Sequence, residues 1–288
     1  MITHNVKELV KLALHEDIGS GDITTEPLIP ALGEGLFAFV ARENFVMAGA
    51  EIGKYVFHEV DPELEVSFSV ADGAPVKAKS RFGTIKGSMA SILTGERVAL
   101  NFLQRLSGIA TSAFEMNRLL MDSRSGTAGL PVVKLLDTRK TTAGWRALEK
   151  YAVRTGGGAN YRFGLYDAAV IKESHIDTVD GIDIAVSLVR GKIPVTAKIC
   201  VEVRNLEEAE AAVNAKADII LIDEMEAPKI VMACQLAEGK SRICLSVGSD
   251  MKQLAKYAKL PVDYIAVGAL TQTVKNVDIS LKLLNMLK

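Results

Sequence analysis

Short apolar runs alternate with helical patterns through the second half of the chain. Strand candidates are the runs 132–136, 168–171, 196–203, 218–222, 243–246 and 264–267. Helical patterns separate them at 142–154, 182–189, 206–215, 227–237 and 251–257. Because strands and helices that alternate in this way build parallel sheets, the pattern predicts an α/β fold. The number and shortness of the strands favour a closed barrel over an open doubly wound sheet.

The first half of the chain has a different pattern. An amphipathic helix is predicted from Val6 and stops near Gly19, and a glycine-punctuated turn region covers 16–25. Strands are expected at 36–41, 64–70 and 83–87, with a helix at 48–57. A long helical region follows at 91–120, where Gly108 indicates either a break or a close approach of another segment. Few polar groups converge in this half, so we expect it to have a structural and interface role.

Composition limits the class of protein. The chain has 288 residues, 49% of them hydrophobic, which is enough for one large domain or two ordinary ones. A net charge of −1 argues against nonspecific nucleic-acid binding. Cys200, Cys234 and Cys244 lack metal-ligand spacing, so we expect free thiols in a reducing cytoplasm. We expect neither a membrane span nor a signal peptide, since residues 1–17 lack an unbroken apolar core.

Two phrases at predicted strand ends carry cations. The first, Asp137-Thr138-Arg139-Lys140-Thr141-Thr142, follows the strand 132–136. The second, residues 154–162, reads Arg-Thr-Gly-Gly-Gly-Ala-Asn-Tyr-Arg. Its glycines allow backbone N–H groups to approach a ligand, and the Arg162 guanidinium can bind a carboxylate or phosphate through two hydrogen bonds. Lys172 adds a further cation after the strand 168–171. These cations lie at the carboxyl ends of strands, where α/β folds have their active sites, and they predict a small polyanionic ligand.

Two carboxylates stand at neighbouring strand ends. Glu202 lies in Cys-Val-Glu-Val at 200–203, and Asp223 ends the apolar run 219–222. An acid in such a place is costly to bury alone, which favours a polar cavity, although a helix N-cap is the simpler explanation for one Asp. Together the two acids suit Mg²⁺ held with a substrate pyrophosphate and waters. They also suit stabilisation of positive charge at a sugar C1 as a leaving group departs.

Two further strand ends carry glycine. Residues 245–249 read Leu-Ser-Val-Gly-Ser, and residues 266–270 read Ala-Val-Gly-Ala-Leu. A lone glycine after a strand is normally a turn. These are, however, the last two strands of the predicted barrel, where backbone N–H groups commonly bind a monophosphate. We therefore expect phosphate contacts from Ser246, Gly248, Ser249, Gly268 and Ala269.

These phrases resemble the signature of the quinolinate phosphoribosyltransferases, also called carboxylating nicotinate-nucleotide pyrophosphorylases. The resemblance rests on residues 137–142, 148–154, 156–158 and 171–172, and it extends to the turn phrase 16–25. It implies an N-terminal α+β sandwich-like domain over 1–112, onto which a C-terminal helix at 276–288 packs back. After a Gly/Ser-rich connection at 123–131, it implies an incomplete β/α barrel, typical of type II phosphoribosyltransferases, within a catalytic domain over 113–275.

The resemblance also implies a reaction of NAD biosynthesis. The ring nitrogen of quinolinate attacks C1 of phosphoribosyl pyrophosphate, pyrophosphate leaves, and the 2-carboxylate is lost as CO₂ to give nicotinate mononucleotide. In this reaction Lys140 and Lys172 would meet the phosphates and the inner carboxylate of the acid. Glu202 and Asp223 would organise Mg²⁺ and the ribose.

Binding of the aromatic acid is assigned by the same resemblance to Arg139 and Arg162, with Arg97 from the adjacent subunit. This implies a homodimer with shared active sites, with a hexamer as a further assembly. From the residues alone, Arg97 on a predicted helix is more simply a partner in a surface ion pair.

Several site positions depart from the family pattern. Tyr161 replaces the histidine of Asn-His-Arg, Cys200 replaces the first acid of Glu-Val-Glu-Val, and Gln272 replaces the histidine of Thr-His. Residues 245–250 read Leu-Ser-Val-Gly-Ser-Asp where the family has Leu-Glu-Ala-Ser-Gly-Gly, and Ser174 replaces the asparagine of Asn-His. Tyr161 can supply a hydrogen-bond donor, but its ordinary pKa of about 10 precludes titration at neutral pH.

The departures leave three interpretations open. The leading one is an active quinolinate phosphoribosyltransferase with variant site residues. A second is a paralogue that acts on a different acid, similar to the pyrophosphorylase-like proteins associated with molybdate transport. A third is a catalytically weak binding or regulatory subunit. Asp250, beside the expected phosphate loop, and the missing histidine at position 161 count against the first, and the retained cations and acids count against the third. His175 and Trp145 are expected to be structural groups.

Overall fold

The computed structural model describes residues 2–28, 33–125 and 130–287. The chain divides into two compact units. The first comprises Met1–Phe114, Thr142–Gly157 and Thr273–Lys288, and the second comprises Glu115–Thr141 and Gly158–Gln272. Segment 142–157 thus groups with the first unit, whereas the domain expected from the sequence at 113–275 includes it. Part of the expected connection at 123–131, residues 126–129, lies outside the described residues.

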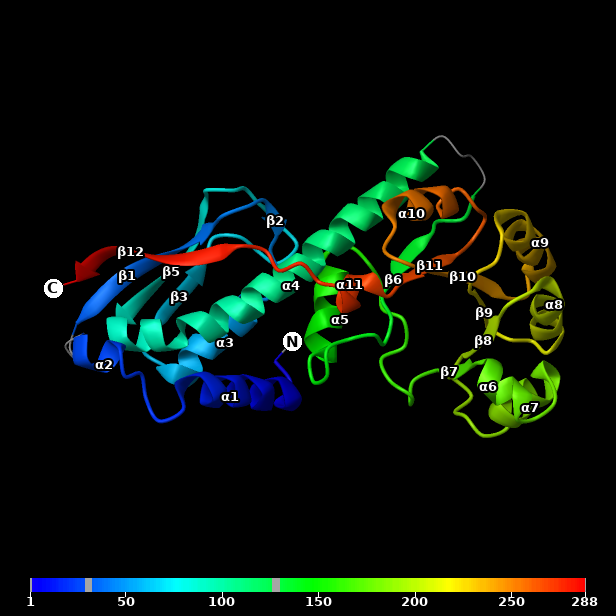
Figure 1. Cartoon of the computed structure of the whole chain (residues 1–288), viewed down its shortest axis with the longest axis horizontal. Coiled ribbons are helices and arrows are strands. Elements are labelled where there is room, and N and C mark those ends of the chain that lie inside the picture. The colour runs from blue at the N-terminus through cyan, green and yellow to red at the C-terminus, as the bar shows by residue number, and fades with distance from the viewer. Residues whose placement is uncertain (1, 29–32, 126–129, 288) are drawn as a thin grey trace. The chain divides into compact units, whose positions relative to one another are not determined.

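The first unit contains a four-stranded antiparallel sheet with the order β12-β1-β5-β3 (Figure 1). Its strands are β1 (Glu34–Ala41), β3 (Glu65–Phe68), β5 (Arg81–Ser88) and β12 (Ile279–Leu287), with a separate pair β2 (Phe45–Val46) and β4 (Pro75–Val76). Its helices are α1 (His4–Ile18), α2 (Thr25–Leu28), α3 (Ala50–Val60), α5 (Arg146–Thr155) and the greater part of α4 (Met89–Arg124). The helices and strands expected in the first half of the chain are therefore present, with small shifts of their ends.

Phenylalanines fill the core of the first unit. Phe39 of β1 is fully buried. Its ring centroid lies 4.9 Å from that of Phe68, 6.0 Å from that of Phe82 and 6.1 Å from that of Phe57. These rings come from β1, β3, β5 and α3, and their contacts hold the four elements together.

Helix α4 is continuous through Gly108. A Cβ at this position would overlap the carbonyl oxygen of Lys275. The glycine therefore marks a close approach of the C-terminal segment and not a break. The same segment is held to α4 where Gln104 Nε2 donates to Ile279 O at 2.9 Å and Val277 N donates to Gln104 O at 3.2 Å.

The helix expected at the C-terminus is wrong. Residues Ile279–Leu287 form strand β12, which pairs antiparallel with β1 from Ile279 opposite Ala41 to Leu287 opposite Glu34, with a bulge at Leu36/Phe37 (Figure 1). The run Ile-Ser-Leu-Lys-Leu-Leu-Asn-Met-Leu is rich in good helix formers, but local propensity is a weak determinant. Strand β1 offers an open edge with unpaired N–H and C=O groups, and β12 satisfies them.

The second unit contains six parallel strands with the order β6-β11-β10-β9-β8-β7. They are β6 (Lys134–Leu136), β7 (Ala169–Ile171), β8 (Ile199–Val203), β9 (Ile219–Ile222), β10 (Arg242–Val247) and β11 (Tyr264–Val267). Helices α6 (Glu173–Asp177), α7 (Ile182–Arg190), α8 (Leu206–Asn214), α9 (Ala227–Ala237), α10 (Met251–Tyr257) and α11 (Ala269–Gln272) follow strands, and α7, α8 and α9 lie beside the sheet (Figure 1). The predicted strands and helices of this half are confirmed.

The six strands form an incomplete barrel. In the described part of the chain, β6 and β7 pair with one neighbour each and not with each other, so the closed barrel expected from pattern alone is wrong. Next to β6 the chain returns as a short extended piece, where Ala159 N donates to Leu135 O at 2.8 Å. Six strands are fewer than the eight that close a β/α barrel of this kind. No helix in the described residues is both long and apolar enough to cross a membrane.

Candidate active site

A polar cavity of about 380 Å³ lies at the carboxyl ends of the parallel strands. It is lined by Thr138, Arg139, Lys140, Tyr161, Arg162, Val170, Lys172, Glu202, Leu221, Asp223, Ser246, Val247, Ala266 and Gly268. Because the strands are parallel, their ends meet at one edge, and residues far apart in sequence converge there. We call this cavity the strand-end pocket.

The predicted cations converge in the strand-end pocket. Lys172 Nζ lies 3.8 Å from Glu202 Oε2, and both side chains remain partly exposed. The stem of Lys140 passes over Gly268, where an added Cβ would lie 3.0 Å from Lys140 Cδ. Thr271 Oγ1 donates to the carbonyl oxygen of Lys140 at 2.8 Å. Gly268 therefore leaves room for Lys140 and the loop after β6 to lie against the end of β11.

Arg162 is partly buried. Its Nη1 donates to Ala168 O at 2.9 Å, and its buried Nε has no hydrogen-bond partner among the described residues. Burial, and then the neighbouring charge of Arg139, lower the pKa of the Arg162 guanidinium. Arginine nevertheless stays charged in proteins. Two like charges held together in a partly buried place favour an anionic ligand between them.

A buried carboxylate holds the chain that carries Tyr161. Asp137 is fully buried and accepts hydrogen bonds from Asn160 Nδ2 at 2.5 Å and from Tyr161 N at 2.9 Å. Asp137, the first residue of the phrase 137–142, thus fixes Asn160 and Tyr161 near the end of the phrase 154–162. No role was predicted for Asp137, although an Asp directly after a buried strand indicates such a contact.

The Tyr161 hydroxyl is engaged by a thiol. It donates to Cys200 Sγ at 3.2 Å, and the ring packs against the buried Leu136, Cys244 and Ala266. Burial raises the pKa of Tyr161 far above its ordinary value and raises the pKa of Cys200 to about 11. Both groups are therefore neutral at neutral pH. Two positions that depart from the family pattern, Tyr161 and Cys200, are in direct contact.

Both predicted acids reach the strand-end pocket. Glu202 lies in β8 and Asp223 follows the neighbouring β9, where Glu202 is in register with Leu221. Asp223 does not cap α9, because Glu226 occupies that N-cap position. Among the described residues no group of three or more His, Cys, Asp or Glu side chains could hold a metal. The donor set fits Mg²⁺, which commonly binds one or two carboxylates together with substrate phosphates and water.

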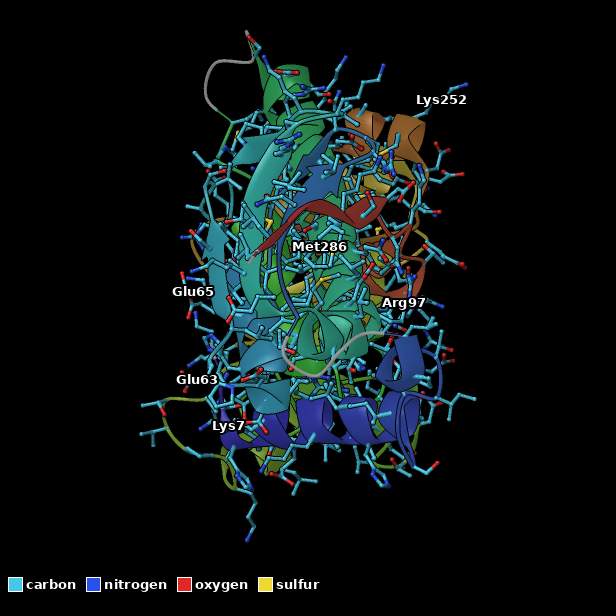
Figure 2. All side chains as sticks on the ribbon, turned by 90° about the vertical axis from the view of Figure 1, so that its left-hand side faces the viewer. Lys7, Glu63, Glu65, Arg97, Lys252 and Met286 are labelled. Atoms are coloured by element: carbon cyan, nitrogen blue, oxygen red, sulfur yellow. The ribbon has the colours of Figure 1, made fainter. Side chains whose placement is uncertain are left out.

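Other predicted site residues lie elsewhere. Gly248, Ser249 and Ala269 follow β10 and β11 without lining the strand-end pocket, although Ser246 and Gly268 do line it. Asp250 is the N-cap of α10 and accepts from Lys252 N at 2.8 Å. Arg97 lies on α4 in the first unit with an exposed side chain (Figure 2). In the described residues Arg97 forms no ion pair, so the surface ion pair considered above is not present.

Several lining residues were not predicted. Leu221, Val170 and Ala266 each precede a predicted site residue by two positions, at Asp223, Lys172 and Gly268. Because side chains on a strand alternate between faces, residues two apart point to the same side. Counting two residues back along the strand from each predicted site residue identifies these three lining residues from the sequence.

A buried ion pair holds α5 and the start of its segment, Thr142, in the first unit. Glu149 of α5 is fully buried, and its Oε1 accepts from Arg105 Nη2 at 2.6 Å while its Oε2 accepts from Thr142 N at 3.2 Å. Trp145 stacks on Phe102 at 4.5 Å between ring centroids. The structural role expected for Trp145 thus has a physical basis.

Two other cavities border the same strands. One of about 540 Å³, largely apolar, lies beside the edge strand β7 and α7 and includes Arg139, Arg162 and Lys172. His175 also lines it, and its Nδ1 accepts from Lys172 N at 3.0 Å, the structural kind of contact expected for this residue. The other, of about 380 Å³, lies at the amino ends of the strands. Neither contains Glu202 or Asp223, so the chemistry is best placed in the strand-end pocket, which both acids line.

Family models match nearly the whole chain. The model described as "Quinolinate phosphoribosyl transferase, N-terminal domain" matches residues 22–107, and the corresponding C-terminal domain model matches residues 109–282. The chain is 36% identical over 302 residues to a mitochondrial quinolinate phosphoribosyltransferase [decarboxylating] 2b of Nicotiana tabacum, covering 98% of this chain and 83% of the relative. It is 37% identical over 282 residues to a probable nicotinate-nucleotide pyrophosphorylase [carboxylating] of Bacillus subtilis, covering 96% of this chain and 94% of the relative.

A solved structure gives the same result. The crystal structure of NadC from Streptococcus pyogenes superposes with a TM-score of 0.91 at 37% sequence identity, covering 99% of each chain. The match extends over both units, and the strand-end residues quoted above lie within the matched C-terminal domain. By sequence and by fold, the chain belongs to the quinolinate phosphoribosyltransferase family.

Proposed function

We propose that this chain transfers phosphoribose from phosphoribosyl pyrophosphate to quinolinate with loss of CO₂, giving nicotinate mononucleotide and pyrophosphate. The observation that carries the proposal is the convergence of four cations and two acids in the strand-end pocket of a member of this family. Two polyanionic reactants repel each other in water. A pocket that neutralises both brings them together and turns their encounter into a local step.

The cations divide the binding task. Arg139 and Arg162 bind the carboxylates of the acid, since their planar guanidinium groups match carboxylate geometry. Lys140 and Lys172 meet phosphate oxygens and the inner carboxylate as point charges. Ser246 and Gly268 line the pocket beside Lys140, and with the flanking Gly248, Ser249 and Ala269 they form the proposed site for the sugar phosphate.

The acids act on the sugar. As the bond from C1 to the pyrophosphate oxygen breaks, its electron pair leaves with pyrophosphate and positive charge grows on the ribose. The Glu202 and Asp223 carboxylates stabilise that charge, while the ring nitrogen lone pair forms the new bond to C1. The bond to the 2-carboxylate then breaks, its electron pair stays on the ring carbon, and that carbon takes up a proton as CO₂ leaves. Mg²⁺, held by these carboxylates with the pyrophosphate, would supply charge neutralisation when bound.

The active unit is proposed to be a homodimer with shared sites, with a hexamer as a further assembly. The exposed Arg97 of one subunit would complete the acid pocket of the other. Mixing Arg97→Ala with Arg139→Ala subunits tests this arrangement, because only the heterodimer regains one complete site. Random mixing of two inactive variants should then restore about a quarter of the parent activity. No restoration would contradict the shared site.

A reducing compartment, the cytoplasm, is proposed from the three free thiols.

Pyrophosphate release tests the reaction itself. The chain is incubated with phosphoribosyl pyrophosphate and Mg²⁺, and with quinolinate, nicotinate or no acid. Release should depend on quinolinate, and Arg139→Ala should lower it by about 100-fold or more. Arg190→Ala on the outer helix α7 is the matched control, since it removes an arginine outside the pocket and should retain activity. Release with another acid and not with quinolinate would instead support the paralogue, which the neutral Tyr161–Cys200 pair favours as a second candidate.

A further inference from the structure

The Tyr161 ring lies between two cavities of the second unit. One is the strand-end pocket, and the other lies at the opposite, amino ends of the strands. The lower cavity, as we call the second, is lined by Lys134, Ile219 and Tyr264, the first residues of β6, β9 and β11, and by Lys198 just before β8. Among the residues that the structure describes, only Tyr161, Arg162 and Val170 line both cavities.

Residues on either side of the ring belong to different cavities. Cys200 lines the lower cavity alone, whereas Glu202 lines the strand-end pocket alone. The two residues point to the same side of β8, about 7 Å apart along the strand. The contact from Tyr161 Oη to Cys200 Sγ therefore directs the phenol toward the lower cavity and away from the acids.

Small neighbours make room for this ring. Cys200, Cys244 and Ala266 occupy the middle of the strands and are almost fully buried. Large side chains normally fill the middle of a β/α barrel. Here the ring of Tyr161, carried in by the extended piece beside β6, takes their place. Its backbone N–H is held by Asp137 and its hydroxyl by Cys200, so the ring is fixed at both ends.

We propose that Tyr161 is a specificity-determining residue that closes the floor of the acid pocket and limits the acid to a single ring, and that Cys200 is its positioning residue. The inference rests on the proposed function, whose acid it restricts to a size class. A fixed, uncharged ring blocks the path between the cavities, so a second fused ring on the acid meets tyrosine carbon atoms. Without that ring the two cavities join, and a longer planar acid can extend downward.

Binding of a one-ring and a two-ring acid tests the floor. Calorimetry compares quinolinate with quinoline-2,3-dicarboxylate, which keeps the ring nitrogen and both carboxylates and adds a fused ring. The parent chain should prefer quinolinate, because overlap in a closed pocket costs affinity. Tyr161→Leu, which shortens the side chain but retains an apolar core residue, should reduce that preference by about 10-fold or more. Tyr161→Phe keeps the ring but removes the hydroxyl that donates to Cys200, so part of the preference should be lost, because the ring is no longer held in place.

Tyr264→Ala is the matched control. It removes an aromatic ring from the lower cavity at a residue that does not line the strand-end pocket. The preference for quinolinate should then stay as in the parent chain. Equal preference in the parent and in Tyr161→Leu would overturn the proposal, and so would a comparable loss of preference in Tyr264→Ala. Thermal unfolding of each variant establishes that it is folded before binding is measured.

The role of Cys200 has its own readout. Cys200→Ser keeps a hydrogen-bond acceptor for the Tyr161 hydroxyl, whereas Cys200→Val keeps an apolar side chain and removes the acceptor. We expect the ratio of the two acid affinities to fall toward one in Cys200→Val and to be retained in Cys200→Ser. A merely structural cysteine would leave that ratio unchanged in both variants, which would exclude the positioning role.

Failure of the floor and failure of the proposed function give different results. If the parent chain binds quinolinate and Tyr161→Leu shows no higher affinity for the two-ring acid, the role of Tyr161 as the floor is wrong and the proposed function stands. If the parent chain binds no quinolinate, the function is wrong. The floor is then judged by whether Tyr161→Leu binds the two-ring acid that the parent rejects, and absence of such binding overturns it.

Discussion

The antiparallel sheet of the first unit and the parallel sheet of the second use their inward-facing residues differently. The first buries Phe39 of β1 against phenylalanines of β3, β5 and α3. The second keeps small residues such as Cys244 and Ala266 in the middle of its strands and puts charges at their ends. Large rings maximise apolar contact, whereas small residues leave space for a ligand and for the one inserted tyrosine. The first sheet is thus built for stability and the second for binding.

Removing an aromatic from the first sheet should have the largest effect on stability. Phe39→Ala deletes a fully buried ring with three ring neighbours and should cost about 3–5 kcal/mol of unfolding free energy. Urea unfolding followed by fluorescence measures this loss, because the only tryptophan, Trp145, lies in the first unit. Tyr166→Ala, at a ring that is 78% exposed, is the matched control and should change stability by less than about 0.5 kcal/mol. Similar losses in both variants would contradict a core-forming role for the phenylalanines.

Removing a charge from the second sheet should affect activity and not stability. Asp223→Asn keeps the size of an exposed strand-end side chain and removes its charge. We expect a loss of about 100-fold in turnover, near 2.7 kcal/mol of transition-state stabilisation, with an unchanged unfolding midpoint. Pyrophosphate release and urea unfolding are measured on the same preparation. A variant that loses stability in proportion to activity would show that Asp223 holds the fold.

The same contrast explains what the sequence could predict. Strong local periods fix the elements of the second half, and the bounds of α9 and α10 agree with the expected ones. The strand ends then identify the cations and acids, because parallel strands bring their ends together whatever the details of packing. Strand β12 was missed because its partner β1 is distant in sequence, and pairing with an open edge overrides the helix-forming composition.

Contacts inside the barrel lie beyond this local information. The hydrogen bond between Tyr161 and Cys200 joins residues 39 positions apart, and its direction depends on how the extended piece beside β6 enters the sheet. The sequence marked both residues as departures from a family pattern. It could not indicate that they touch, or that the phenol donates to a thiol instead of to a ligand.

Alkaline pH should reduce the stability of the second unit through its buried Cys200 thiol. Burial raises the pKa of Cys200 from its ordinary 9.0 to about 11, so the folded protein holds this proton more tightly than the unfolded chain. The associated stability is fully present below pH 9 and is lost as the pH rises from 9 to 11, at about 1.4 kcal/mol per pH unit. Cys200→Val lacks this thiol and should not lose this contribution. Between pH 9 and 11 the parent should therefore lose stability relative to the variant by about 1.4 kcal/mol per pH unit. A constant difference up to pH 11, measured in reductant, would contradict the raised pKa.

The smallest effect is expected from charge pairs on the outside of the parallel sheet. Arg190 Nη1 lies 3.0 Å from Asp218 Oδ2, and Arg190 Nη2 donates to Lys216 O at 2.7 Å, with side chains 43% and 31% exposed for the ion pair. Arg190→Lys keeps the charge and loses the second contact. Because exposed pairs are screened by water and salt, the loss should stay below about 1 kcal/mol and should shrink further in 0.5 M salt, measured by urea unfolding. A loss of several kcal/mol would mean that charges stabilise the second sheet as aromatic rings stabilise the first. The division between a sheet for stability and a sheet for binding would then have to be abandoned.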